Sequence, residues 1–366
     1  MIPETQREMV MSEASLSRRA AMATLATGAF GLAAAGGGML ALASPAEAQK
    51  RGRAASPGTA IQAAIEEAYG RYRTLQEGKN ADYIPALAEV SSAFFGIAVA
   101  GKEAKVYEVG DSKELFSIQS ISKVFTAALV MQESGDSKIE DSVGVDATGQ
   151  VFNSINAVEQ YRGKEMNPFV NPGAIATVGN VKGSSPDEIW AKILQIHSDF
   201  AGRQLEVNQP VYKSESDTNH RNRAISALMS AYERFPMDPV VAVDLYTRQC
   251  SINVSAHDLA VMGATLAFGG KNPVTGKQVI DRSHVPGLLA IMATAGMYDD
   301  SGKWLFRTGL PTKSGVGGGL VAVAPGKFGI GTFAPPLDGA GNSVRGQRAI
   351  TDIVRALNAN PYAQTG

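Results

Sequence analysis

Cysteine and histidine are scarce in this chain, and their scarcity excludes several kinds of site. Cys250 is the only cysteine among 366 residues, so neither an intrachain disulfide nor a cysteine-based metal cluster can form. The four histidines, at positions 197, 220, 257 and 284, lack the short spacing that brings two imidazoles to one metal ion. We therefore expect no metal site.

An excess of one charge is also missing. The formal net charge is −1 and no segment carries a dense stripe of Lys and Arg, so nucleic acids and anionic membrane surfaces are not expected partners. Hydrophobic residues make up 44% of the chain and charged residues 19%, an ordinary globular composition that allows a substantial core. The length suits one large domain or two interleaved ones.

Residues 1–48 have the pattern of an export signal. Paired arginines at 18 and 19 precede an Ala-, Gly- and Leu-rich stretch over 20–43, and an Ala-x-Ala cleavage site ends at Ala48. Paired arginines before a weakly hydrophobic core favour the twin-arginine route and a periplasmic location, with a cytoplasmic protein as the alternative. An uncleaved membrane anchor is a further alternative that the glycines disfavour, and no stable membrane span is expected in the mature form. Residues 49–58 are expected to form a disordered linker.

Hydrophobic periodicity then separates strand-forming ends from a helical middle. Helical spacing predicts an amphipathic helix from about residue 59, and two β-rich runs over 94–100 and 105–110 predict a hairpin. Near the C-terminus, the runs 319–324 and 328–333 flank a Pro-Gly-Lys turn and predict a second hairpin, which a helix over about 343–357 follows.

The middle of the chain, over about 137–305, is predicted to be mostly helical, with helices expected over 186–197, 223–234, 239–249 and 256–268. Strands at both ends around a helical middle predict an α/β (α+β) fold in which the termini build one sheet and a helical domain is inserted. The predicted catalytic domain spans 59–357, with its α/β part at 59–136 and 306–357, its helical part at 137–305, and a C-terminal tail at 358–366.

A hydroxyl and an amine stand three residues apart where an apolar strand is predicted to run into an apolar helix, in Phe116-Ser-Ile-Gln-Ser-Ile-Ser-Lys-Val-Phe125. At this spacing Ser120 and Lys123 share a helix face, with Cβ atoms about 5–6 Å apart. Lys123 can take the Ser120 proton if burial or a neighbouring cation lowers its pKa. This is the Ser-x-x-Lys arrangement of serine β-lactamases and penicillin-binding proteins. The motif is short, and an exposed Ser cap beside a solvated Lys is the alternative.

A second element that this chemistry needs lies near the C-terminus, where Lys313-Ser-Gly-Val316 and three further glycines lead into the predicted hairpin. In Ser-x-x-Lys enzymes, a Lys-Thr/Ser-Gly element on the edge strand lies across the pocket from the serine. Its backbone N–H can then bind the developing oxyanion. A glycine-rich strand entry is the alternative, and a phosphate loop is excluded because the glycines do not open a helix.

With these motifs the chain closely resembles the serine-dependent glutaminase family. The matching stretches follow the family's order over about residues 60–357: Ala81-Asp-Tyr-Ile-Pro85, the segment from Phe116 to Phe125, Asn167-Pro-Phe-Val-Asn-Pro-Gly-Ala-Ile175, Ser214-Glu215, Arg221-Asn222, Tyr246, Cys250-Ser-Ile252, Gly296-Met-Tyr-Asp299, Lys313-Ser-Gly-Val316, Pro335-Pro-Leu-Asp338 and Gly341-Asn-Ser-Val-Arg-Gly346.

The resemblance implies a β-lactamase-like fold with an antiparallel sheet, and hydrolysis of L-glutamine to L-glutamate and ammonia through an acyl-serine intermediate. It implies no metal or organic cofactor, and a homodimer or homotetramer. The implied catalytic residues are Ser120 as nucleophile, Lys123 as its base, Tyr298 as an aid to proton transfer, and Val316, whose backbone N–H completes the oxyanion hole with that of Ser120. The implied substrate-binding residues are Tyr83, Ser120, Asn171, Glu215, Asn222, Tyr246, Tyr298 and Val316.

The chemistry of free glutamine agrees with these roles, because an α-ammonium calls for a carboxylate such as Glu215 and an α-carboxylate calls for amide or phenol donors. Two departures from the family pattern concern substrate specificity: Pro172 stands where Ala is common, and the residues between Glu215 and Asn222 differ. Two other functions remain open, a β-lactam-directed acyl-serine hydrolase and a non-catalytic periplasmic amino-acid-binding protein. Nitrocefin turnover would indicate the first, and glutamine binding without ammonia release the second.

Overall fold

The computed structural model describes residues 56–164 and 166–363. The predicted export signal and most of the predicted linker lie outside these residues. Helix α2 (Pro57–Tyr72) opens the described chain, so the prediction of a linker up to residue 58 is wrong for its last two residues. The Ser56 side chain accepts a hydrogen bond from the Thr59 backbone N–H, and Pro57 stands in the first turn, both of which favour a helix start here.

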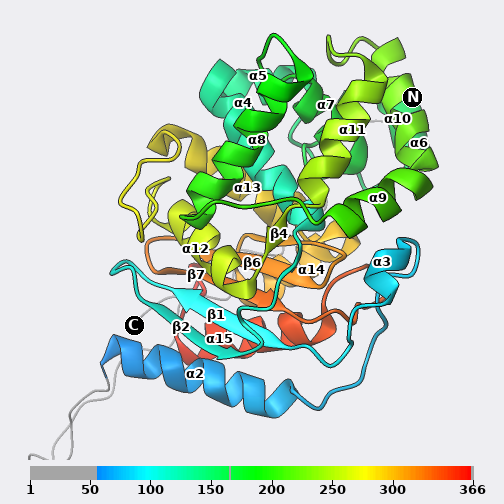
Figure 1. Cartoon of the computed structure of the whole chain (residues 1–366). Coiled ribbons are helices and arrows are strands. Elements are labelled where there is room, and N and C mark those ends of the chain that lie inside the picture. The colour runs from blue at the N-terminus through cyan, green and yellow to red at the C-terminus, as the bar shows by residue number, and fades with distance from the viewer. Residues whose placement is uncertain (1–55, 165, 364–366) are drawn as a thin grey trace, which may run out of the picture. The chain divides into compact units, whose positions relative to one another are not determined.

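Five antiparallel strands form the main sheet, in the order β2-β1-β7-β6-β5 (Figure 1). β1 (Gly96–Ala100) and β2 (Val106–Gly110) form the first predicted hairpin, and β6 (Gly319–Ala324) and β7 (Phe328–Phe333) form the second. β1 pairs with β7, so the two ends of the chain meet inside the sheet, and β5 (Thr312–Ser314) forms the edge next to β6. The predicted fold class is confirmed.

Helices α2 and α15 cover one face of this sheet and lie side by side in Figure 1. α15 (Val344–Ala356) is amphipathic: Ala349, Ile350 and Ile353 are fully buried, whereas Arg348 is exposed. Its apolar stripe and that of α2 form a core with the side chains of this sheet face, because burying the stripe removes apolar area from water.

Helix α12 (Ala256–Ala267) covers the opposite face, across β1, β6 and β7. A Cβ on Gly331 would lie 2.1 Å from the Ala256 carbonyl oxygen, and a Cβ on Gly329 would lie 2.1 Å from the Ala264 backbone nitrogen. Backbone therefore packs directly on backbone, which only glycine permits. The predicted helical part over 137–305 is wrong at this point, because α12 belongs with the sheet.

The helical layer consists of α4 to α11 and lies on the α12 side of the sheet (Figure 1). Its apolar side chains join those of α12 and of the facing sheet surface in one core. The bounds are α4 Ser122–Ser134, α5 Asp136–Ser142, α6 Ile155–Tyr161, α7 Asn171–Gly179, α8 Pro186–Ala201, α9 Gln209–Thr218, α10 His220–Ala231 and α11 Pro239–Cys250.

The helices predicted in this region are present, although α10 begins and ends three residues before the predicted 223–234. The described residues also form the short strands β3 and β4, which pair with each other, and the helices α3, α13 and α14. Their bounds are β3 Phe116–Ser117, β4 Asn253–Val254, α3 Pro85–Ala88, α13 Val285–Ala295 and α14 Ser301–Thr308. Within residues 56–164 and 166–363, no helix is long and apolar enough to cross a membrane.

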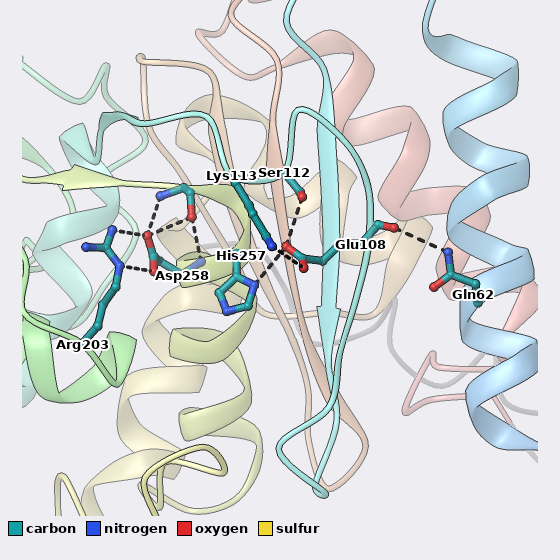
Figure 2. Close-up of polar contacts among 8 residues, drawn as sticks. Gln62, Glu108, Ser112, Lys113, Arg203, His257 and Asp258 are labelled. Atoms are coloured by element: carbon teal, nitrogen blue, oxygen red, sulfur yellow. Dashed lines mark hydrogen bonds and ion pairs between the residues drawn. The ribbon is translucent and has the colours of Figure 1, made fainter.

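Polar contacts attach the first turn of α12 to the sheet edge (Figure 2). Nδ1 of His257 lies 2.9 Å from Oε1 of Glu108 on β2, and the Ser112 hydroxyl, in the loop after β2, donates to the same oxygen at 3.0 Å. That loop leads into β3, so these contacts help to fix the segment that carries Ser120.

The same turn of α12 is attached to the helical layer through Asp258 (Figure 2). Nε and Nη2 of Arg203, just after α8, donate to the two Asp258 carboxylate oxygens at 2.8 and 2.7 Å. Asp258 also accepts from the backbone and hydroxyl of Ser255, whose own hydroxyl caps the helix, so the two residues form a capping box. The Asp258 carboxylate thus both stabilises the N-terminus of α12 and attaches this helix to the helical layer through Arg203.

Candidate active site

Ser120 lies in a tight turn between a short strand and a helix. The chain leaves β3, passes through a 3₁₀ turn over Gln119–Ile121 and enters α4. Gln119 has φ +51°, a left-handed conformation that costs a non-glycine residue about 1–3 kcal/mol and is common at functional sites. The turn brings Ser120 to the wall of a cavity, at the electropositive N-terminal end of α4.

Lys123 is fully buried in the first turn of α4. Its Nζ donates to Oδ1 of Asn171 at 2.7 Å and to the Phe169 carbonyl oxygen at 3.2 Å. Burial lowers the pKa of Lys123 to about 8, and the negative charge of Glu215 partly opposes this shift. The amine is therefore much easier to deprotonate than an exposed lysine, which is the condition that the sequence motif requires of a base.

The wall opposite Ser120 is the end of β5 and the glycine-rich segment that follows it. A Cβ on Gly315 would lie 2.7 Å from the Ile118 carbonyl oxygen, and one on Gly317 would lie 2.8 Å from that of Ser117. The glycines therefore let this backbone approach the nucleophile turn, as predicted. Val316, between them, lines the cavity with Ser120, so the backbones of both residues meet at one site.

Tyr298 adopts φ +53° and its ring is buried beside the same wall. Its hydroxyl donates to the Ser314 carbonyl oxygen at 3.1 Å, and Nζ of Lys313 lies 4.5 Å from the ring centroid. Burial raises the pKa of the Tyr298 phenol, and hydrogen bonding to Ser120 partly opposes this shift. The phenol therefore stays protonated and can carry a proton between neighbouring oxygen and nitrogen atoms.

The cavity has a volume of about 270 Å³ and suits a small molecule. Glu215, from α9, is the one acidic residue among the described residues that line it. Its Oε2 accepts a hydrogen bond from Nε2 of Gln119 at 3.3 Å, and burial raises its pKa to about 7. The lining residues are Tyr83, Ile84, Gln119, Ser120, Phe152, Asn153, Asn171, Glu215, Thr218, Asn219, Arg221, Asn222, Tyr246 and Val316.

Asn171 connects the base to the substrate-binding side of the cavity. Its Oδ1 accepts from Lys123 and also from the Tyr246 hydroxyl at 3.2 Å, and its Nδ2 donates to Oδ1 of Asn222 at 3.0 Å. Pro172 follows in the first turn of α7, where a backbone N–H has no partner within the helix, so its ring removes no helix bond. The departure at Pro172 thus leaves Asn171 in place.

The structure brings the predicted site residues to one place. Seven of the eight residues predicted to bind substrate line the cavity: Tyr83, Ser120, Asn171, Glu215, Asn222, Tyr246 and Val316. Tyr83 lies at the mouth and is 54% exposed. Lys123 and Tyr298 lie behind the lining and contact Asn171 and Ser120 respectively. Sequence reasoning assigned no role to the other seven lining residues, Ile84, Gln119, Phe152, Asn153, Thr218, Asn219 and Arg221. Three of these, Ile84, Gln119 and Arg221, lie in stretches that match the family.

This geometry defines a serine hydrolase that works by acyl transfer. A serine stands on a strained turn at a helix N-terminus, next to a buried lysine with a depressed pKa and opposite a glycine-rich backbone wall. The arrangement, on an antiparallel sheet flanked by helices, is that of the β-lactamase-like fold.

Comparison with known proteins gives the family. The family model for glutaminase matches residues 78–362. A glutaminase from Colwellia psychrerythraea is 49% identical over 302 residues, which cover 82% of this chain and 97% of that protein. The structure named "Probable glutaminase ybaS" superposes with a TM-score of 0.82 at 43% identity, over 83% of this chain and 99% of the other.

A covalent complex of the Bacillus subtilis glutaminase YbgJ with 5-oxo-L-norleucine superposes with a TM-score of 0.71 at 27% identity, over 83% of this chain and 97% of the other. This chain belongs to the glutaminase family.

Proposed function

We propose that this glutaminase hydrolyses the side-chain amide of L-glutamine with Ser120 as nucleophile and Lys123 as its base. The observation that carries the assignment is the position of Ser120, between a buried amine whose pKa is lowered to about 8 and the backbone of Val316, in a cavity that contains one buried carboxylate. The reaction yields L-glutamate and ammonia.

In the first half of the reaction, the Ser120 hydroxyl oxygen attacks the γ-carboxamide carbon while its proton passes to the neutral amine of Lys123. The backbone N–H groups of Ser120 and Val316 stabilise the oxyanion; losing one such donor typically raises the barrier by about 2.7–4 kcal/mol. The tetrahedral intermediate then expels ammonia, which takes the proton held by Lys123. Tyr298, whose hydroxyl donates to the Ser314 carbonyl oxygen and whose phenol pKa is affected by the neighbouring Ser120, relays this proton.

In the second half, water attacks the glutamyl ester, and its proton passes through the same groups to the Ser120 oxygen. Glu215 binds the α-ammonium of the substrate, and Tyr83, Asn171, Asn222 and Tyr246 contribute neutral polar groups. The covalent complex that YbgJ forms with 6-diazo-5-oxo-L-norleucine supports a covalent intermediate in this family.

Ammonia release from L-glutamine tests this assignment in the wild type and two matched serine variants. Ser120→Ala removes the nucleophile and should abolish turnover with an unchanged melting temperature. Ser122→Ala alters the neighbouring serine, whose hydroxyl donates to the Gln119 carbonyl oxygen at 2.7 Å and does not line the cavity, so it should lose at most about tenfold. Turnover that survives in Ser120→Ala would refute the mechanism, and nitrocefin turnover would indicate a β-lactam-directed enzyme.

We also propose that residues 1–48 direct export to the periplasm through the twin-arginine route and that the mature chain begins at Gln49. The paired arginines, the weakly hydrophobic stretch and the Ala-x-Ala site support this proposal. Cell fractionation with N-terminal sequencing checks it, and replacing both arginines by lysine should leave the protein in the cytoplasm. Processing at another residue, or a cytoplasmic wild type, would contradict it.

A homodimer or homotetramer is proposed from the resemblance to the glutaminase family. Light scattering coupled to gel filtration gives the mass in solution, for comparison with the 38.4 kDa of one full chain. A species of one chain's mass across the working concentration range would contradict the proposal.

A further inference from the structure

The one basic residue among the described residues that line the cavity is Arg221. It is the second residue of α10. The helix before it, α9, carries Glu215. The side chain is exposed, and within residues 56–164 and 166–363 no carboxylate lies within ion-pair distance of its guanidinium. A full positive charge therefore stands at the mouth of the cavity without an anion from the described chain.

The contacts of Arg221 leave most of its guanidinium available. Its Nε donates to the Asn153 carbonyl oxygen at 2.8 Å, across the rim from α10, and this is its one side-chain hydrogen bond to the described residues. Asn153 itself lines the cavity. The bond fixes the plane of the guanidinium, and the two Nη groups remain free to bind a carboxylate end-on, which is the geometry that arginine favours.

The neutral polar groups deeper in the cavity cannot supply a positive charge to pair with the α-carboxylate of a bound amino acid. Asn171 already accepts from Lys123 and Tyr246, and its amide donates to Asn222. The amine of Lys123 is buried behind the lining and must be neutral to act as a base. An α-carboxylate bound by these groups alone would lack a cationic partner, although desolvating a carboxylate without one is costly.

We propose that Arg221 binds the α-carboxylate of the substrate and thereby selects free L-glutamine over glutamine whose α-carboxyl group is blocked. The inference rests on the proposed function, because it assumes glutamine in this cavity with its α-ammonium at Glu215. Arg221 on α10 then binds the α-carboxylate of a free amino acid, and Glu215 on the adjacent helix α9 binds its α-ammonium. A blocked α-carboxyl group, as in an amide or a peptide bond, offers Arg221 no anion.

The test compares two substrates on variants of the full chain. L-glutamine and its α-amide differ at the α-carboxyl group, which is an anion in the first and a neutral amide in the second. Steady-state ammonia release gives KM and kcat for each. If the α-amide is not turned over, its inhibition constant against L-glutamine replaces KM. The variants are Arg221→Gln, Arg221→Lys and the control Arg223→Gln, whose arginine lies on the same helix, donates to the Ser216 carbonyl oxygen at 2.8 Å and does not line the cavity.

Arg221→Gln should raise the KM for L-glutamine about tenfold or more, with little change in kcat, because a charge-assisted hydrogen bond to the α-carboxylate is lost. The KM of the α-amide, or its inhibition constant, should not change. Arg221→Lys, which keeps the charge but not the bond to Asn153, should restore much of the KM, and Arg223→Gln should match the wild type.

Two results would overturn the inference. An equal rise in KM for both substrates, without rescue by Arg221→Lys, would mean that Arg221 acts by fixing the backbone at Asn153 and not by binding the α-carboxylate. An unchanged KM for L-glutamine would leave Arg221 without a part in binding. Either result can occur while Ser120→Ala abolishes turnover, so the inference can fail with the proposed function intact; surviving activity in Ser120→Ala would mean that the proposed function itself had failed.

Discussion

Helix α12 meets strand β7 with backbone against backbone among apolar side chains, whereas the surroundings of Ser120 contain buried ionisable side chains. At the first interface, Gly329 and Gly331 leave no room for a side chain atom, and the neighbouring residues are apolar. At the second, Lys123, Lys313 and Glu215 are all buried. One region gains stability from close packing, and the other places ionisable groups where burial is unfavourable for their charged forms.

The difference between the two regions shows that the groups with shifted pKa values lie around Ser120. Burial lowers the pKa of both lysines and raises that of Glu215, so each group is closer to losing or gaining a proton at neutral pH than it would be in water. The positive φ angles of Gln119 and Tyr298 add backbone strain at the same place. Substitutions in the two regions should therefore separate activity from stability.

The largest effect is expected at Lys123. Lys123→Met should lower kcat about 10²–10⁴-fold, because general-base catalysis is lost. Thermal stability should hold or rise, since a buried amine is replaced by an apolar chain of similar length and Asn171 keeps its bond from Tyr246. Ammonia release and the melting temperature check both parts. A variant that keeps its kcat would show that Lys123 is not the base.

At the packed interface the expected result is reversed. Gly331→Ala should lower the free energy of unfolding by about 1–3 kcal/mol or more, because the new Cβ would clash with the Ala256 carbonyl oxygen and the Ala260 nitrogen. Gly70→Ala, in α2 with nothing within 4 Å of the added Cβ, is the control and should stabilise by up to about 1 kcal/mol. Urea unfolding measures both, and equal values would contradict the packing argument.

The pH dependence sharpens the role of the buried ionisable groups. Lys123 has a pKa of about 8, so its neutral form is populated above pH 8, and kcat should fall by about tenfold per pH unit well below that value. Glu215, with a pKa of about 7, must be ionised to bind the α-ammonium, so KM should rise as pH falls below 7.

Steady-state rates between pH 5.5 and 9.5, roughly the range over which both groups titrate, separate the fall of kcat below pH 8 from the rise of KM below pH 7. Glu215→Gln is the matched variant. It should have a raised KM that no longer changes with pH near 7. The fall of kcat at low pH should remain but move to lower pH, because the charge of Glu215 raises the pKa of Lys123. A kcat that is flat with pH would exclude Lys123 as the titrating base.

The smallest effect is expected at the attachment of α12 to the helical layer. Asp258→Ala removes a helix cap and a buried carboxylate partner, and should cost about 1–2 kcal/mol of stability. Arg203→Gln removes only the half-exposed partner and should cost less than about 1 kcal/mol. Urea unfolding of both variants tests the order. A larger cost for Arg203→Gln would show that the ion pair outweighs the cap.

Local signals predicted much of this fold. The runs on either side of Pro325-Gly326-Lys327 predicted the β6–β7 hairpin with the observed bounds. The motif around Ser120 and Lys123 indicated the proposed nucleophile, which lies in the cavity wall. The pairing of β3 with β4 was not predicted, because its two-residue strands lie far apart in the chain and show no periodicity. The left-handed backbone of Gln119 and its contact with Glu215 were missed for a similar reason, since both depend on packing from other segments.

The sequence by itself determined the local elements and the chemical groups: helices and strands follow from short-range periodicity and caps, and the hydroxyl, amine and carboxylate of the site are given by residue type. Only the tertiary structure decided what those groups can do. Lys123 can serve as the proposed base because α7 and α11 enclose it and supply Asn171 and Tyr246, and burial removes the water that would stabilise its charge. Likewise α12 is an ordinary helix in the sequence, and its place on the sheet depends on glycines of β7 that lie far from it along the chain.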